Sequence, residues 1–121
     1  MLTILDVGAD NVAGFVLDGK IEDEEYERAV RLIEEKLQRH EKLRIYTEIQ
    51  KIGGLSLQSS VKNITFKLKH FRDFERTAIV CNKAWLDKYV SVMGKLFPSI
   101  EARSFTFEEK QRALKWIKSN P

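Results

Sequence analysis

The sequence contains few of the residues that cross-link or interrupt a chain: one cysteine, two prolines and six glycines among 121 residues. A single cysteine, Cys81, excludes an internal disulfide. Its apolar neighbours predict a buried and unreactive thiol, which suits a reducing cytoplasm. The chain has no low-complexity tract, internal repeat or long linker, so we expect one domain over residues 1–121 with its own hydrophobic core.

The sequence also lacks a long apolar run and a large excess of charge of one sign. No window of about 18 apolar residues could span a membrane, and the first residues do not have the pattern of a signal peptide. The net charge is only +3. It permits contact with anionic lipids or nucleic acid without favouring either. We expect a cytoplasmic protein with at most a peripheral membrane association and no nucleic-acid partner.

Short apolar segments between turn residues predict five strands. The turn residues Gly8–Asn11 connect the first two segments, and we expect these to form a hairpin. The fourth segment, Thr77–Cys81, is a continuous apolar run, which is typical of a central strand covered on both faces. The five predicted strands are Leu2–Leu5, Val12–Leu17, Leu43–Ile49, Thr77–Cys81 and Ile100–Phe105.

Helical periodicity appears in the segments between and after these strands. The first helix opens with the acidic residues Glu22–Glu25, where negative charge favours a helix N-terminus, and Asp23 is the expected cap. We interpret this acidic cluster as helix initiation, not as a metal site. Further helices are predicted from about Ser56 to Arg72, from about Lys83 to Leu96, and after a capping box at Thr106 and Glu109, with a loop over Gln50–Leu55.

The resulting order of elements is β-β-α-β-α-β-α-β-α. Because a helix between two strands allows a right-handed crossover with parallel pairing, we expect an α/β fold with a mostly parallel sheet packed by helices. Folds of this class bind ligands in the loops at the carboxyl ends of their strands.

The chain also contains a series of short motifs in a fixed order. They are Leu17-x-Gly19-Lys20-Ile21-x-x-Glu24-x-Tyr26, the strand Arg44–Glu48, His70-Phe71-x-x-Phe74-x-Arg76-x-Ala78-Ile79-Val80, Trp85, and Phe105-x-x-x-Glu109 before Ala113-x-x-Trp116-Ile117. In this order they resemble the SpoIIAA-like family, which is related to STAS domains and to the lipid-binding CRAL-TRIO (Sec14-like) fold. The resemblance covers nearly the whole chain. It implies a single STAS-like domain with a role in regulation or ligand binding instead of catalysis.

One segment departs from the pattern of the STAS anti-sigma-factor antagonists. Proteins of that kind carry an Asp-Ser-Ser-Gly-like segment after the third strand, in which a serine is phosphorylated. The equivalent segment here, Glu48–Ser56, lacks that motif. Ser56, Ser59 and Ser60 lie nearby, but serines at a helix start usually serve as caps. We therefore expect no phosphorylation switch of that kind.

Apolar residues of the second and third predicted helices are the candidates for a ligand pocket. If these two helices can separate, their inner side chains could line an apolar cavity; otherwise they simply fill the core. The resemblance to lipid-binding folds favours the cavity. The residues concerned are Leu57, Val61, Leu68, Trp85 and Tyr89.

The outer face of the second predicted helix is the candidate surface for a membrane or a partner protein. Phe66 stands opposite the apolar stripe of that helix, and Lys62, Lys69 and His70 surround it. A single exposed Phe among cations is common on a solvated surface. The same arrangement also suits contact with an anionic membrane surface or with a protein.

The sequence shows no catalytic constellation. His40 and His70 have no partner at a metal-ligand spacing, and Gly53-Gly54 lacks the other residues of a nucleotide-binding loop. We expect no catalytic residue, metal or cofactor. The favoured hypothesis is a non-enzymatic regulatory or binding module for a small apolar or lipid-like ligand, with weak membrane-surface association. One alternative is a protein-interaction module that acts like the anti-sigma antagonists but without their phosphoserine switch. Its partner could be another protein or a second copy of this chain. The other alternative is a small enzyme.

Overall fold

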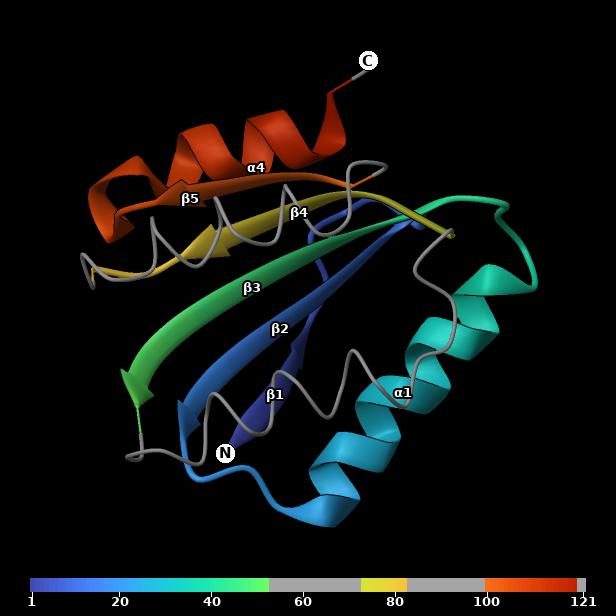
Figure 1. Cartoon of the computed structure of the whole chain (residues 1–121), viewed down its shortest axis with the longest axis horizontal. Helices are drawn as coiled ribbons and strands as arrows, with labels where there is room; N and C mark the ends of the chain where they lie inside the picture. Colours follow the sequence, from blue (N-terminus) through green and yellow to red (C-terminus); the bar gives the residue numbers. More distant parts are fainter. Residues whose placement is uncertain (53–72, 83–99, 120–121) are drawn as a thin grey trace.

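The computed structural model describes residues 1–52, 73–82 and 100–119. Within these ranges a five-stranded sheet lies between two α-helices (Figure 1). The helices predicted around residues 56–72 and 83–96 lie outside the described residues. The strands are β1 (Leu2–Leu5), β2 (Val12–Gly19), β3 (Leu43–Ile52), β4 (Phe74–Val80) and β5 (Glu101–Phe105), and the helices are α1 (Asp23–Leu37) and α4 (Lys110–Lys118), with the 3₁₀ turn Phe107–Glu109 before α4.

The strands lie across the sheet in the order β1-β2-β3-β4-β5. β1 and β2 are antiparallel, with Leu2 opposite Leu17, and the other neighbouring pairs are parallel. The predicted hairpin and the mostly parallel sheet are therefore confirmed. Gly14 of β2 is needed in this hairpin, because a Cβ atom there would lie 2.4 Å from the carbonyl oxygen of Leu5.

The predicted end of the third strand is wrong. β3 continues to Ile52, since Asp18 and Gly19 of β2 pair with Lys51 and Ile52. The loop predicted over Gln50–Leu55 therefore begins too early. Backbone pairing with a neighbouring strand extends β3 beyond the apolar segment that the sequence reveals.

The fourth strand also begins earlier than predicted. β4 starts at Phe74 instead of Thr77, because Phe74 pairs with Leu43 and Arg76 pairs with Arg44 of β3. β4 has a neighbour on each side, but β3 is the middle strand of the sheet. The polar residues before Thr77 hid the true start of β4 from the apolar pattern.

The first turn of α1 is fixed by its acidic residues, although the cap is Glu22 and not Asp23. The backbone N–H of Glu22 donates to Glu25 Oε1 at 3.1 Å, which completes a capping box. The second oxygen of Glu25 accepts the N–H of Leu2 at 2.6 Å, so the same carboxylate joins α1 to β1. These two backbone donors lower the pKa of Glu25, the Leu2 N–H most.

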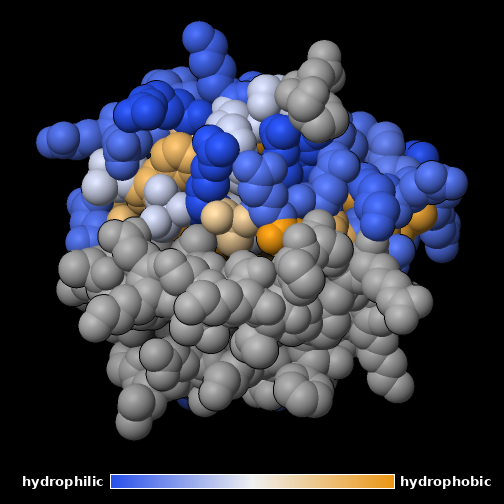
Figure 2. Space-filling view, turned by 45° about the horizontal axis from the view of Figure 1, so that its top comes forward, coloured by the Kyte–Doolittle hydropathy of each residue, from blue (hydrophilic) through white to orange (hydrophobic). Residues whose placement is uncertain are grey.

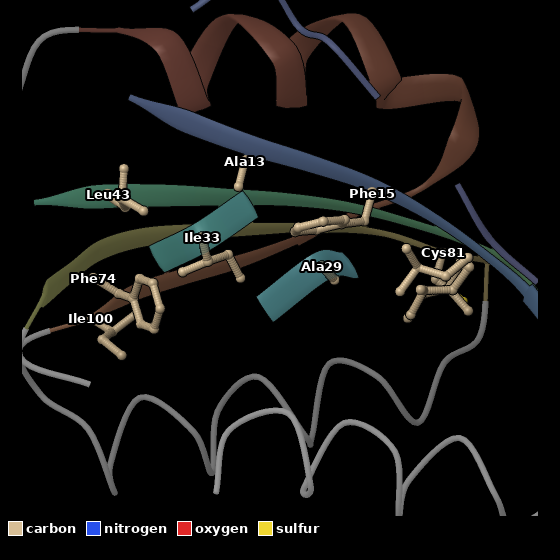
Figure 3. Packing of buried hydrophobic residues seen from close by; sticks show 11 residues of the cluster. Ala13, Phe15, Ala29, Ile33, Leu43, Phe74, Cys81 and Ile100 are labelled. Atoms are coloured by element: carbon tan, nitrogen blue, oxygen red, sulfur yellow. The ribbon is translucent and has the colours of Figure 1, made fainter. Parts of the chain in front are cut away.

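Two apolar clusters fill the two sides of the sheet. The larger cluster packs against α1 around Phe15 and Ile33 (Figure 3). The smaller cluster lies beneath α4 and includes Val80 and Ala113. Cys81 is buried in the larger cluster as a free thiol, as predicted. The apolar run that ends β4 therefore contributes to both sides of the sheet, as its composition predicts.

Candidate functional site

The predicted site residues lie outside the described part of the chain, so both predicted sites stay predictions. This holds for the pocket residues and for the outer face of the second predicted helix. The residues concerned are Leu57, Val61, Leu68, Trp85 and Tyr89 for the pocket and Lys62, Phe66, Lys69 and His70 for the surface.

A shallow depression of about 300 Å³ lies along one side of α1. Tyr26 and Val30 line it with apolar surface, while Glu27 and Arg31 contribute one charge of each sign. Tyr26 is buried and Val30 is half-buried, whereas the two charged residues are exposed. The depression therefore has an apolar floor and a polar rim. Such a shape can hold a small molecule that has one apolar end and one polar end.

The helical spacing of α1 explains how these four residues meet. Residues four apart lie one above the other on a helix, so Tyr26 aligns with Val30 and Glu27 aligns with Arg31. Burial raises the pKa of Tyr26 above its usual value, so its phenol stays protonated over the physiological range. The floor of the depression therefore carries no charge of its own.

On the opposite side of the sheet, a buried carboxylate lies between β3 and α4. Glu48 is 3% exposed, and its Oε2 atom accepts a hydrogen bond from the hydroxyl oxygen of the buried Tyr46 at 2.9 Å. Lys110, the first residue of α4, places its Nζ atom 3.4 Å from the same carboxylate. Burial, followed by the bond to Glu48, raises the pKa of Tyr46. This cluster holds the N-terminal end of α4 against the sheet.

The C-terminal end of α4 is held by two buried arginines of the sheet. Arg44 Nη1 donates to the carbonyl oxygen of Ile117 at 2.8 Å and also to that of Ser119. Arg76 Nη1 donates to the carbonyl oxygen of Trp116 at 2.9 Å. Cations at this position compensate the partial negative charge of a helix C-terminus and satisfy its last carbonyls.

Both arginines also have carboxylate partners. Arg44 Nε lies 2.6 Å from Glu75 Oε1, and Arg76 Nε lies 3.6 Å from Glu101 Oε2. Their side chains are only 5% and 11% exposed, respectively. Because buried charges are costly without partners, these contacts explain how β3 and β4 tolerate a guanidinium beneath a helix.

A further ion cluster joins the β1–β2 turn to the end of α1. Asp10 in the turn lies 2.6 Å from His40 Nε2 and 3.1 Å from Arg39 Nε, and Lys36 Nζ donates to its backbone oxygen at 2.9 Å. The hydrogen bond from Arg39, and next that from His40, lowers the pKa of Asp10 well below its usual value. This exposed cluster closes the amino end of the parallel strands.

The sequence matches a known family over most of its length. The SpoIIAA-like family model matches residues 12–118. The chain belongs to the SpoIIAA-like family. The match begins at the first residue of β2 and ends at the last residue of α4, so it includes the depression on α1 and both clusters beneath α4.

A solved structure shows the same fold. A crystal structure of an uncharacterized protein of the DUF3478 family with a SpoIIAA-like fold, from Shewanella loihica PV-4, superposes with a TM-score of 0.63 at 22% sequence identity. The similarity covers 97% of this chain and 92% of that one. No curated protein matches the sequence. The similarity to the Shewanella protein establishes the SpoIIAA-like fold.

Two further properties concern this SpoIIAA-like chain. In residues 1–52, 73–82 and 100–119, no three His, Cys, Asp or Glu side chains are placed to hold a metal ion. No helix in the same ranges is both long and apolar enough to cross a bilayer.

The depression on α1 was not predicted from the sequence, because Glu27 and Arg31 resemble any solvent-facing pair of charges. Tyr26, which is part of the family motif, was the one signal that could have indicated it.

Proposed function

We propose that this SpoIIAA-like chain is a non-enzymatic, STAS-like binding module of the cytoplasm that holds a small lipid-like ligand and associates weakly with membrane surfaces. The observation that carries this proposal is the depression on α1. Its apolar floor of Tyr26 and Val30 suits a short hydrocarbon segment, and the charged pair on its rim suits a polar head. Each buried methylene group of such a ligand would contribute about 0.8 kcal/mol.

The size of the depression limits the ligand. Pockets for small molecules span roughly 300–1,000 Å³, so a depression of about 300 Å³ is at the lower end of that range. A molecule the size of a medium-chain fatty acid fits better than a two-chain phospholipid. Because ordering such a ligand also costs free energy, we expect weak and reversible binding.

The charged clusters favour a binding function over a catalytic one, because each cluster holds a structural element in place. Arg44 and Arg76 hold the last carbonyls of α4. Glu48 is engaged by Tyr46 and Lys110 at the other end of that helix. A catalytic acid or base needs a group that can reach a substrate, whereas these groups are committed to the packing of α4.

The test combines native mass spectrometry with ¹⁵N-resolved NMR. Freshly purified wild type is examined for a bound small molecule, and the protein is then titrated with decanoate. We expect chemical-shift changes centred on residues 26–31 of α1. Val30→Trp should fill the depression and abolish both the adduct and these shifts. Arg28→Trp adds the same ring at an exposed position on the outer side of α1 and should preserve them.

Two results would contradict this proposal. One is the absence of any adduct together with unchanged shifts at residues 26–31 in the presence of decanoate. The other is equal binding by wild type and Val30→Trp. Shift changes confined to residues outside α1 would place the ligand elsewhere and would reject the depression as its site.

A protein-interaction module is the second candidate, and the exposed edge of the sheet favours it. β1 is an edge strand, and its Ile4 side chain is 44% exposed. An apolar edge strand can pair with a strand of another chain. We expect Ile4→Lys to abolish self-association or partner capture. Sedimentation equilibrium of both proteins, with a pull-down, distinguishes this function, since a monomer without a partner would reject it.

A further inference from the structure

The two described helices carry opposite charge on opposite faces of the sheet. α1 contains six acidic and three basic residues, whereas α4 contains four basic residues and no acidic one. α1 packs on the larger apolar cluster and α4 on the smaller one, so the sheet separates them (Figure 1). Of the two described helices, α4 is therefore the positively charged one.

Three of the four cations of α4 point away from the sheet, whereas Lys110 contacts the buried Glu48. Ala113 and Ile117 are buried against it, while Arg112, Lys115 and Lys118 are exposed on the other side of the helix. Arg112 pairs with Glu109, but Lys115 and Lys118 have no ion-pair partner in the described ranges. In Figure 2 the described surface is mostly hydrophilic, with smaller hydrophobic areas.

An aromatic ring extends this basic face onto β5. The guanidinium of Arg103 lies 4.8 Å from the centre of the Trp116 ring, and that of Arg76 lies 5.1 Å from it. Arg103 is 54% exposed on its strand, and Trp116 is half-buried. Stacking on the ring and an ion pair with Glu101 at 3.2 Å hold Arg103 beside the cations of α4.

We propose that the outer face of α4, formed by Arg112, Lys115 and Lys118 with the neighbouring Arg103, docks the chain on an anionic phospholipid membrane. This inference deepens the membrane association in the proposed function and rests on it, but it does not require a bound ligand. Lysine and arginine beside an anionic leaflet each strengthen binding about fivefold. The acidic α1, which lies on the opposite face of the sheet, would then point away from the leaflet.

Other anionic partners fit this face less well. A protein interface needs an apolar centre, and the large hydrophobic side chains exposed among the described residues, Met1 and Ile4, are on the β1 side instead. Nucleic-acid affinity grows with the number of phosphates that a surface neutralises, and this face offers only four cations, Arg112, Lys115, Lys118 and Arg103. A membrane leaflet requires neither a shape match nor an apolar anchor.

The experiment is co-sedimentation with phosphatidylserine-containing vesicles and with pure phosphatidylcholine vesicles, at low and high salt. Wild type should bind only the anionic vesicles and only at low salt. Lys115→Glu/Lys118→Glu should weaken binding by about thirtyfold or more, because two attractive charges become repulsive. The control Lys20→Glu/Arg28→Glu changes the net charge equally on the α1 side and should bind like wild type.

Several outcomes would overturn this inference. They are equal binding by wild type and Lys115→Glu/Lys118→Glu, an equal loss in the control, or tighter binding of duplex DNA than of anionic vesicles. Lys115→Gln/Lys118→Gln removes the two charges without reversing them and should lose less vesicle affinity than the Glu variant. This graded loss separates a charge effect from a folding defect. Val30→Trp should still bind vesicles, so failure of the ligand proposal and failure of membrane docking give different results.

Discussion

On the α1 side of the sheet, helix and strands meet mainly through apolar side chains, with Ile33 against Phe15 and its neighbours. On the α4 side, apolar contacts are joined by Arg44 and Arg76, which reach from the strands to the last carbonyls of the helix. The two helices therefore depend on different physics. The first is positioned by the removal of apolar surface from water, and the second also needs buried charges that stay paired.

The largest expected effect tests whether the α4 side tolerates charge in general or only paired charge. Val80 is fully buried beneath α4. Val80→Asp places a carboxylate there without a designed partner, and we expect it to lower the free energy of unfolding by more than about 4 kcal/mol. Chemical denaturation followed by circular dichroism measures the change. Ile4→Asp, at an exposed position, should cost less than about 1 kcal/mol.

An unchanged unfolding transition for Val80→Asp would contradict the burial of this strand end. It would also remove the contrast between paired and unpaired charge on the α4 side. If the variant does not fold at all, Val80→Ala provides the measurable alternative. It should cost about 2 kcal/mol through the cavity it leaves.

Arg44→Met sharpens the comparison from the other direction, by removing a paired charge. The variant removes the Arg44 donor from the carbonyl oxygen of Ile117 and from the carboxylate of Glu75, while the carbonyl oxygen of Ser119 keeps its bond from Arg76. We expect the free energy of unfolding to fall by about 3 kcal/mol, because the remaining carboxylate would be partly buried without its ion-pair partner. Arg103→Met removes an exposed arginine and should cost about 0.5 kcal/mol or less.

The α1 side gives the matching apolar deletion. Ile33→Ala should cost about 3 kcal/mol as well, but through a cavity. Since Ile33 and Arg44 lie on opposite sides of the sheet, the two losses should add in the double variant. Equal costs with strong coupling would show that the two sides do not act independently. A neutral Arg44→Met would show that Arg44 is not needed to hold α4.

The same contrast explains what the sequence could predict. Apolar periodicity was sufficient for the hairpin, the parallel sheet and α1, since these depend on which residues leave water. Arg44, Tyr46 and Glu48 alternate with apolar residues in β3, which by period-two reasoning indicates a solvent-facing side. In the structure α4 covers that side of β3. The sequence pattern of β3 cannot show this, because α4 comes much later in the chain.

The depression on α1 escaped prediction for a related reason. Its shape depends on how the helix is seated on the sheet, whereas the periodicity of α1 only shows that Tyr26 faces inward. The ends of β3 and β4 were missed because backbone pairing, not side-chain polarity, sets them. Family motifs give the order of the elements, and packing decides which polar residues become enclosed.

The smallest expected effect concerns the ion cluster that closes the amino end of the strands on the α1 side. Asp10→Asn removes the carboxylate that Arg39 and His40 contact, so at neutral pH the variant should melt slightly below wild type. The folded protein holds the pKa of Asp10 below its ordinary value of 3.8. Its contribution to stability is therefore complete above that value and is lost as the pH falls towards the lower folded pKa. The gap in melting temperature should consequently close in acid, and also at high salt.

Glu41→Gln, which neutralises an exposed carboxylate next to His40, is the control, and its melting temperature should not converge with that of wild type in acid. A gap that stayed constant from neutral pH to below 3.8 would mean that the Asp10 carboxylate does not stabilise the turn, and that the α1 side is held by apolar packing and backbone caps alone.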